Sequence, residues 1–209
     1  PDTTGESRTI KQIEWCRKKG LLQQALTLIE GKMPMVICNK VISYDMNKQE
    51  EVSEKTETGW RKAQTFTTLG KFVEETKKVL GKTWESDDNF LVNQWANSYR
   101  KECYMKFSEA IEGAQVPETI AMQIKVLMKG IGNKVYIRKK QQSICFGYRF
   151  KKPTDNQRFM EFMFLHSFLK KQRNIINHGI TGEDMRCDAN RIETLIDTYL
   201  EYACSLEMQ

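Results

Sequence analysis

Residues 159–179 read "FMEFMFLHSFLKKQRNIINHG", an apolar run followed directly by a polar and basic one. The apolar spacing is typical of a buried helix face. Thr154 or Asp155 would begin this helix and Gly179 would end it. We predict one long helix, buried at its start and carrying an Arg, Asn and His cluster at its end. Its core candidates are Phe159, Met160, Phe162, Met163 and Phe168.

The rest of the chain is also dominated by helical patterns. Ser7 can cap a first helix, Gly20 and Gly31 can end the first two, and Pro34 suits the first turn of a third. Asp188 can cap the last helix. Only four prolines are present, and helix formers are plentiful, so we predict an all-α fold. The expected helices span 7–20, 21–31, 34–44, 60–80, 88–112, 117–130, 154–178 and 188–207.

Two stretches depart from the helical pattern. Residues 45–58 are polar and acid-rich, which is typical of a loop or insertion. Residues 135–150, "VYIRKKQQSICFGYRF", combine β-branched and aromatic residues around a polar centre, which is compatible with a small β-hairpin. We therefore expect a helical domain with a short β-element near 135–150.

The charge is uneven along the chain. Its 209 residues are 40% hydrophobic and 29% charged, with a net charge of +6. Between Lys125 and Arg158 there are ten Lys and Arg residues against one acid, Asp155. Such a basic stretch is compatible with a polyanionic partner, and it is also what a solvated face looks like.

The six cysteines are widely scattered, and the chain has only two histidines. We expect reduced, mostly buried cysteines and no metal site, because no set with metal-ligand spacing is present. No run of 18 apolar residues occurs, so we expect a cytoplasmic protein without a membrane partner. Because the sequence opens on "PDTTGESR" without a methionine, we expect a piece of a longer protein.

The end of the long helix carries residue types suited to phosphodiester chemistry. Arg173 offers a permanent planar charge to phosphate, and His178 can exchange a proton near neutral pH. Asn174 is the i, i+4 neighbour of His178 and can orient it. The last turn before Gly179 is expected to loosen, which would bring His178 toward Arg173. RNA carries its own 2′-hydroxyl nucleophile, so such a site needs neither a protein nucleophile nor a metal.

Candidate RNA contacts extend from this cluster to the basic stretch. They are Asn177, Lys170, Lys171, Arg138, Lys139 and Lys140. The structural alternative is equally direct, because a basic last turn stabilises the helix dipole and glycine is an ordinary helix stop. The other histidine, His166, lies inside the apolar run, so we expect it in the core or at an interface.

The pattern Arg173-Asn174-x-x-x-His178, near the end of a long penultimate helix, resembles the R-x(4–6)-H motif of HEPN domains. The stretch "IEWCRKKGLLQQALTLIEGKMP" (13–34) is similar to the start of the HEPN region in CARF–HEPN ancillary ribonucleases of type III CRISPR systems. The resemblance covers both ends of the chain. It implies a helical bundle with its core in 7–44 and 154–207 and a family-specific helical insertion over about 45–150.

The same resemblance implies a function. The chain would be a homodimeric, metal-independent endoribonuclease that cleaves single-stranded RNA to 2′,3′-cyclic phosphate ends, as a CRISPR-associated antiviral effector in a prokaryotic cytoplasm. Arg173 and His178 would be the catalytic pair and Asn174 the supporting polar residue. It would need no cofactor. Cyclic oligoadenylate would be an activator only if a CARF sensor domain, absent from this chain, preceded it.

Two alternatives stay open at this point. A HEPN toxin of a toxin–antitoxin or abortive-infection system would use the same residues with another partner. A non-catalytic helical scaffold or dimerisation domain would use 7–31 as a TPR-like helix pair, although no 34-residue period continues through the chain.

Overall fold

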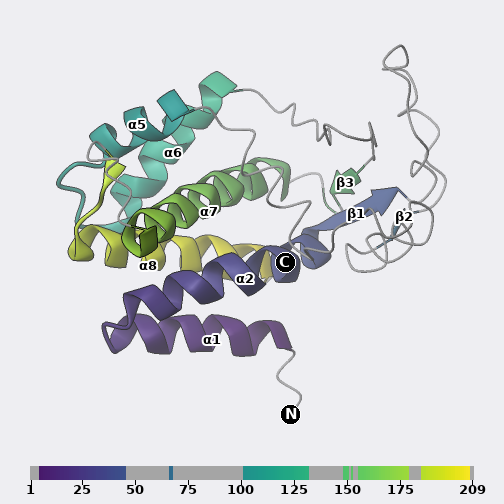
Figure 1. Cartoon of the computed structure of the whole chain (residues 1–209). Helices are drawn as coiled ribbons and strands as arrows, with labels where there is room; N and C mark the ends of the chain where they lie inside the picture. Colours follow the sequence, from purple (N-terminus) through teal and green to yellow (C-terminus); the bar gives the residue numbers. More distant parts are fainter. Residues whose placement is uncertain are drawn as a thin grey trace.

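The computed structural model of the chain shows a helical bundle with a small sheet at one end (Figure 1). No helix among the described residues is long and apolar enough to cross a membrane. The description below covers residues 5–45, 66–67, 101–131, 148–150, 152, 155–178 and 185–207.

Helix α7 (Asp155–His178) lies at the centre of the bundle, as the sequence predicts. It packs against α2 (Leu22–Val41), α8 (Ala189–Glu207) and α6 (Pro117–Ile131). Every residue from 159 to 169 is buried, including all five predicted core residues. The apolar run therefore positions this helix, because burying large side chains is the main favourable contribution to folding.

Helix α5 (Lys101–Ala110) adds an aromatic layer to this core. The Phe107 ring meets Phe168 edge-on at 4.9 Å between centroids, and the Tyr104 ring stacks on Phe164 at 5.6 Å. Edge-to-face and offset rings are favoured geometries for aromatic pairs. Helices α5 and α6 thus share the core with both ends of the chain. Their assignment to a family-specific insertion stays a prediction.

The cap and the buried face of α8 are those predicted from the sequence. The Asp188 carboxylate accepts a hydrogen bond from the Arg191 backbone N–H at 2.7 Å, which is the N-cap contact expected from the sequence. Helix α8 then buries one continuous face against α7, α2 and α6. The buried residues predicted on this face are Ile192, Leu195, Ile196, Tyr199, Leu200 and Ala203.

Helix α1 (Gly5–Lys18) ends as predicted at Gly20, which has a φ of +70°. The Leu21 N–H donates to the carbonyl of Cys16 at 2.8 Å, five residues back, so the helix closes in a Schellman motif. This sharp stop lets α2 return antiparallel along α1, and the two helices lie side by side.

The predicted division of the next stretch was wrong. Helix α2 runs unbroken through Gly31 and Pro34, where we expected a stop and a restart. Proline removes the hydrogen bond to the carbonyl four residues back, and its ring crowds that carbonyl, at a cost of about 3 kcal/mol. The helix continues because one apolar row stays in register on both sides of that position. This buried row contains Leu26, Ile29, Met33, Ile37 and Val41.

A three-stranded antiparallel sheet follows α2, in the order β2-β1-β3. Strand β1 (Ile42–Asp45) occupies the end of the predicted helix 34–44, and β2 (Phe66–Thr67) lies inside the predicted helix 60–80, so both predictions were wrong there. Strand β3 (Tyr148–Phe150) lies at the end of the stretch where we expected a hairpin, and it pairs with β1. Residues 132–147 and 46–65 lie outside the described residues.

The cysteines with described side chains are all free thiols: Cys16 and Cys187 are buried, and Cys103 and Cys204 are partly buried. Cys38 has no described side chain, and Cys145 lies outside the described residues. Cys16 belongs to the same buried core cluster as Ile13.

Candidate functional site

The last turns of α7 present a strip that faces away from the core. Gln172 and Ile175 are 0% and 9% exposed, and they mark the core-facing side of the helix. Because each residue advances about 100°, backbone positions 173 and 178 lie about 140° apart. Two arcs of the helix surface join these positions. Gln172 and Ile175 lie on one of them, and positions 174 and 177 lie on the other, which points away from the core. We call these four positions, 173, 174, 177 and 178, the α7 outer arc.

The predicted loosening of the last turn does not occur up to His178, because the helix keeps its α-helical form through that residue. The His178 side chain and Gly179 lie outside the described residues. The two ends of the arc therefore keep their angular separation within one chain. A group that contacted both ends would have to lie across the arc, over Asn174.

Arg173 is held by an acid from the neighbouring helix. Its Nη1 atom lies 2.7 Å from Oε2 of Glu30 on α2, and both side chains are partly buried. Lys170, one turn earlier on α7, reaches the other oxygen of Glu30 at 3.6 Å. The Nε atom of Arg173 is buried and has no hydrogen-bond partner among the described residues. Glu30 thus fixes one side of a guanidinium that retains further donors.

Asn177 is fixed to the same helix. Its Oδ1 atom accepts a hydrogen bond from Nε2 of Gln23 at 2.8 Å. Arg173 and Asn177 are i, i+4 neighbours, so one edge of the outer arc runs along α2. Asn174 lies between this edge and position 178 and is half-buried.

Lys171 and the basic stretch do not join this edge. The Lys171 ammonium lies over the Tyr104 ring of α5, 4.4 Å from its centroid. Burial, together with the nearby charge of Lys101, lowers the pKa of Lys171. The structure therefore brings Lys170, Arg173 and Asn177 together beside α2 and places Lys171 elsewhere. Arg138, Lys139 and Lys140 lie outside the described residues.

His166 is a core residue, as the sequence predicts. It is 0% exposed, and its Nδ1 atom lies 3.3 Å from the Tyr199 hydroxyl. Burial lowers its pKa from 6.5 to about 3, so it is neutral at pH 7. Because the chain contains two histidines and His166 is buried, His178 is the remaining candidate for an acid or base.

Sequence reasoning missed two residues that shape this site. Glu30 is the single acid in α2, which is the signal that could have marked it. Gln172, inside the quoted motif, is fully buried; its amide donates to the Met185 carbonyl and accepts from the Cys187 N–H at 3.0 Å. It fixes the segment that leads into α8.

That segment forms one wall of a hollow beside the outer arc. The hollow has a volume of about 510 Å³, within the usual range of ligand pockets. Its rim includes Gln23, which also holds Asn177, and the exposed Arg186. The apolar walls suit a planar base, and the rim carries one cation, Arg186, and one acid, Asp188. The other lining residues are Leu22, Ile176, Cys187, Ala189 and Ile192.

Comparisons with known proteins do not add to this geometry. No protein-family model, curated protein or solved structure matches the chain. Among the described residues, no group of three or more His, Cys, Asp or Glu side chains could hold a metal ion.

Proposed function

We propose that this chain is an endoribonuclease that cleaves single-stranded RNA without a metal ion, with Arg173 and His178 as the catalytic pair. The observation that carries the proposal is the outer arc of α7: an arginine fixed by Glu30 at one edge, a histidine at position 178 of the other edge, and asparagines at the two positions between them. The resemblance of this motif to HEPN ribonucleases supports the same assignment.

The chemistry follows from the residue types. The ribose 2′-oxygen attacks the adjacent phosphorus as its proton leaves to a base, and the bond to the 5′-oxygen breaks as that oxygen gains a proton. The products are a 2′,3′-cyclic phosphate and a 5′-hydroxyl. Arg173 would stabilise charge on the non-bridging oxygens, and His178 would transfer a proton. Asn174 would orient the phosphate or the imidazole between them.

Glu30 acts on this reaction through Arg173. A carboxylate 2.7 Å from Nη1 restricts the rotamers of a long side chain, so less entropy is lost when phosphate binds. Phosphate and Glu30 would also compete for the same guanidinium charge. Glu30 is therefore a positioning residue, and its partial neutralisation by Lys170 lessens its repulsion of RNA.

The proposed active form is a homodimer. Each chain offers one candidate histidine, His178, because His166 is buried, whereas this reaction needs both a base and an acid. Two outer arcs meeting at a two-fold axis would bring two arginines and two histidines to one interface, where the arginine of each chain could act with the histidine of the other. Such a dimer would also remove the difficulty that positions 173 and 178 diverge by about 140° within one helix. By its resemblance, the setting would be CRISPR-associated defence.

The test is the identity of the cleavage products under metal-free conditions. We expect the purified chain to cleave a single-stranded RNA in excess EDTA and to leave 2′,3′-cyclic phosphate and 5′-hydroxyl ends, identified by mass spectrometry. An RNA with a 2′-deoxy substitution at the cleaved position should resist cleavage, because its nucleophile is missing. Activity that EDTA abolishes and Mg²⁺ restores, or products with 5′-phosphates, would contradict the mechanism.

A further inference from the structure

Helix α1 carries a second set of outward-facing side chains suited to nucleic acid. Arg8, Lys11, Gln12 and Trp15 line a shallow hollow of about 240 Å³ on its outer side. We call these four residues the α1 outer face. On an α-helix their positions fall within an arc of about 100°, opposite the buried residues Ile10 and Ile13. This face is separate from the α7 outer arc.

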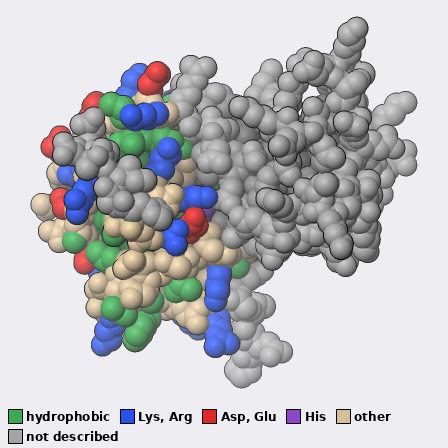
Figure 2. Space-filling model, in the orientation of Figure 1, with side chains coloured by type: hydrophobic (Ala, Val, Ile, Leu, Met, Phe, Trp, Pro, Cys, Tyr) green, Lys and Arg blue, Asp and Glu red, His purple; other side chains and the backbone are tan. Residues whose placement is uncertain are grey.

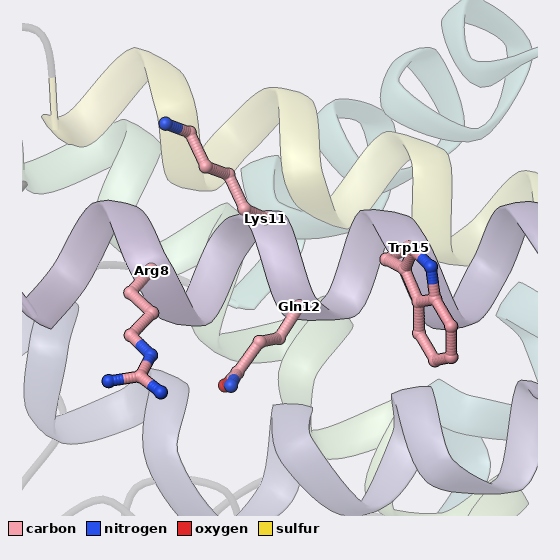
Figure 3. Close-up of a pocket in the computed structure, with 4 residues that line it drawn as sticks. All are labelled: Arg8, Lys11, Gln12 and Trp15. Atoms are coloured by element: carbon pink, nitrogen blue, oxygen red, sulfur yellow. The ribbon is translucent and has the colours of Figure 1, made fainter.

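Trp15 is the most informative member of this face. It is 56% exposed, whereas the other aromatic side chains with described burial, such as Tyr104 and Phe107, are buried in the core. In Figure 3, Arg8, Gln12 and Trp15 extend to one side of α1, and Lys11 stands at the opposite edge. A solvent-exposed indole beside cations is the arrangement on which unpaired bases stack.

The basic side chains of α1 differ in whether they pair with acids of α8 or face the solvent. Arg17 turns inward and forms ion pairs with Asp197 and, at 3.9 Å, with Glu193 of α8. Arg8 and Lys11 are exposed and form no ion pair with any acid whose side chain the structure describes. The lower edge of Figure 2, where Figure 1 places α1, shows blue Lys and Arg side chains on either side of a green hydrophobic one. The basic charge is thus available to a polyanion.

We propose that the α1 outer face is a second contact surface for single-stranded RNA, in which Trp15 stacks on a base while Arg8 and Lys11 contact phosphates. The proposal rests on RNA being the ligand of this protein, as proposed above. Neighbours three and four residues apart on a helix stand about 5–6 Å from each other, so one short strand can contact all of them. The α1 outer face would hold the substrate, and the α7 outer arc would cleave it.

The experiment measures binding apart from cleavage. The full chain carrying Arg173→Ala is titrated into a fluorescein-labelled single-stranded oligouridylate, and binding is followed by fluorescence anisotropy. In this background Trp15→Leu should weaken binding by roughly 5- to 100-fold, the usual range for losing one stacked base. Trp15→Phe should retain most of the affinity, because the ring is kept. Met122→Leu, at a 55% exposed position of α6, is the matched apolar control and should bind normally.

Salt dependence tests the cations. Neutralising Arg8 and Lys11 as Arg8→Gln with Lys11→Gln should reduce the slope of log affinity against log salt by about 1.4, since each single-strand phosphate contact contributes about 0.7. Lys106→Gln with Lys129→Gln removes the same charge from exposed positions of α5 and α6, on the opposite side of the bundle in Figure 1. This control should leave the slope nearly unchanged.

Three outcomes would overturn the proposal. They are undiminished binding by Trp15→Leu, equal slopes for the two double variants, and a changed oligomeric state of Trp15→Leu with unchanged RNA affinity, which would make the face a protein contact. The proposed cleavage fails separately. A chain that binds RNA through Trp15 but never cuts it refutes the catalytic assignment and leaves this surface standing.

Discussion

The two halves of α7 differ in how deeply their side chains are buried and in what those side chains contact. Residues 159–169 are all buried, and aromatic rings from α5 and α8 pack against Phe168 and Phe162. Residues 170–177 keep only Gln172 and Ile175 buried, and the three side chains that face α2, those of Lys170, Arg173 and Asn177, have polar partners in Glu30 and Gln23. The first half fixes where the helix lies. The second half can therefore hold charged groups in defined positions without depending on them for stability.

The largest effect that would test this division is on stability. Phe168→Ala should lower the free energy of unfolding by about 3–5 kcal/mol, because it leaves a cavity beside Phe107 and Tyr104. Chemical denaturation followed by circular dichroism measures this loss. Ile176→Ala, at a 40% exposed position of the polar half, is the matched control and should change stability by less than about 0.5 kcal/mol. Equal losses at the two positions would show that the halves do not differ in their contribution to the fold.

A smaller effect on stability should come from the titration of His166. In the folded chain burial holds the pKa of His166 at about 3, so the unfolded chain, with a pKa near 6.5, binds the extra proton below pH 6.5. Stability should therefore be fully present above pH 6.5 and fall as the pH drops, by about 2 kcal/mol near pH 5. The control is His166→Asn, which removes this titrating group. Its free energy of unfolding should therefore change less with pH. Identical pH dependence of the two proteins would mean that His166 is not the buried neutral base described here.

The sequence predicted what depends on local patterns. Helix α7, helix α8 and the Asp188 cap followed from periodicity and capping chemistry. The helix stop predicted at Gly31 and the restart predicted at Pro34 were wrong. There, burial of the apolar row around Met33 outweighed the low helix propensity of glycine and proline. Strand β1 was missed because its partners lie far away in the sequence.

The candidate site was predictable only along one helix. Arg173, Asn174 and His178 share a motif, so their neighbourhood follows from helical geometry. Glu30 comes from α2, more than a hundred residues earlier, and no local pattern pairs it with Arg173. The inward orientation of Gln172, which holds the start of α8, likewise depends on where that segment returns. Contacts between distant segments require the fold itself.

The measurement that tests the central claim most directly is single-turnover RNA cleavage by Arg173→Ala, by His178→Ala and by their equal mixture after subunit exchange. Each variant should retain its thermal stability and lose at least about 100-fold in rate, the usual cost of removing a transition-state donor or a general acid or base. If each site takes Arg from one chain and His from the other, the mixture should recover about a quarter of the wild-type sites. Wild-type rates for both single variants, with any loss confined to about 0.3–1 kcal/mol of stability from the helix dipole, would contradict the account.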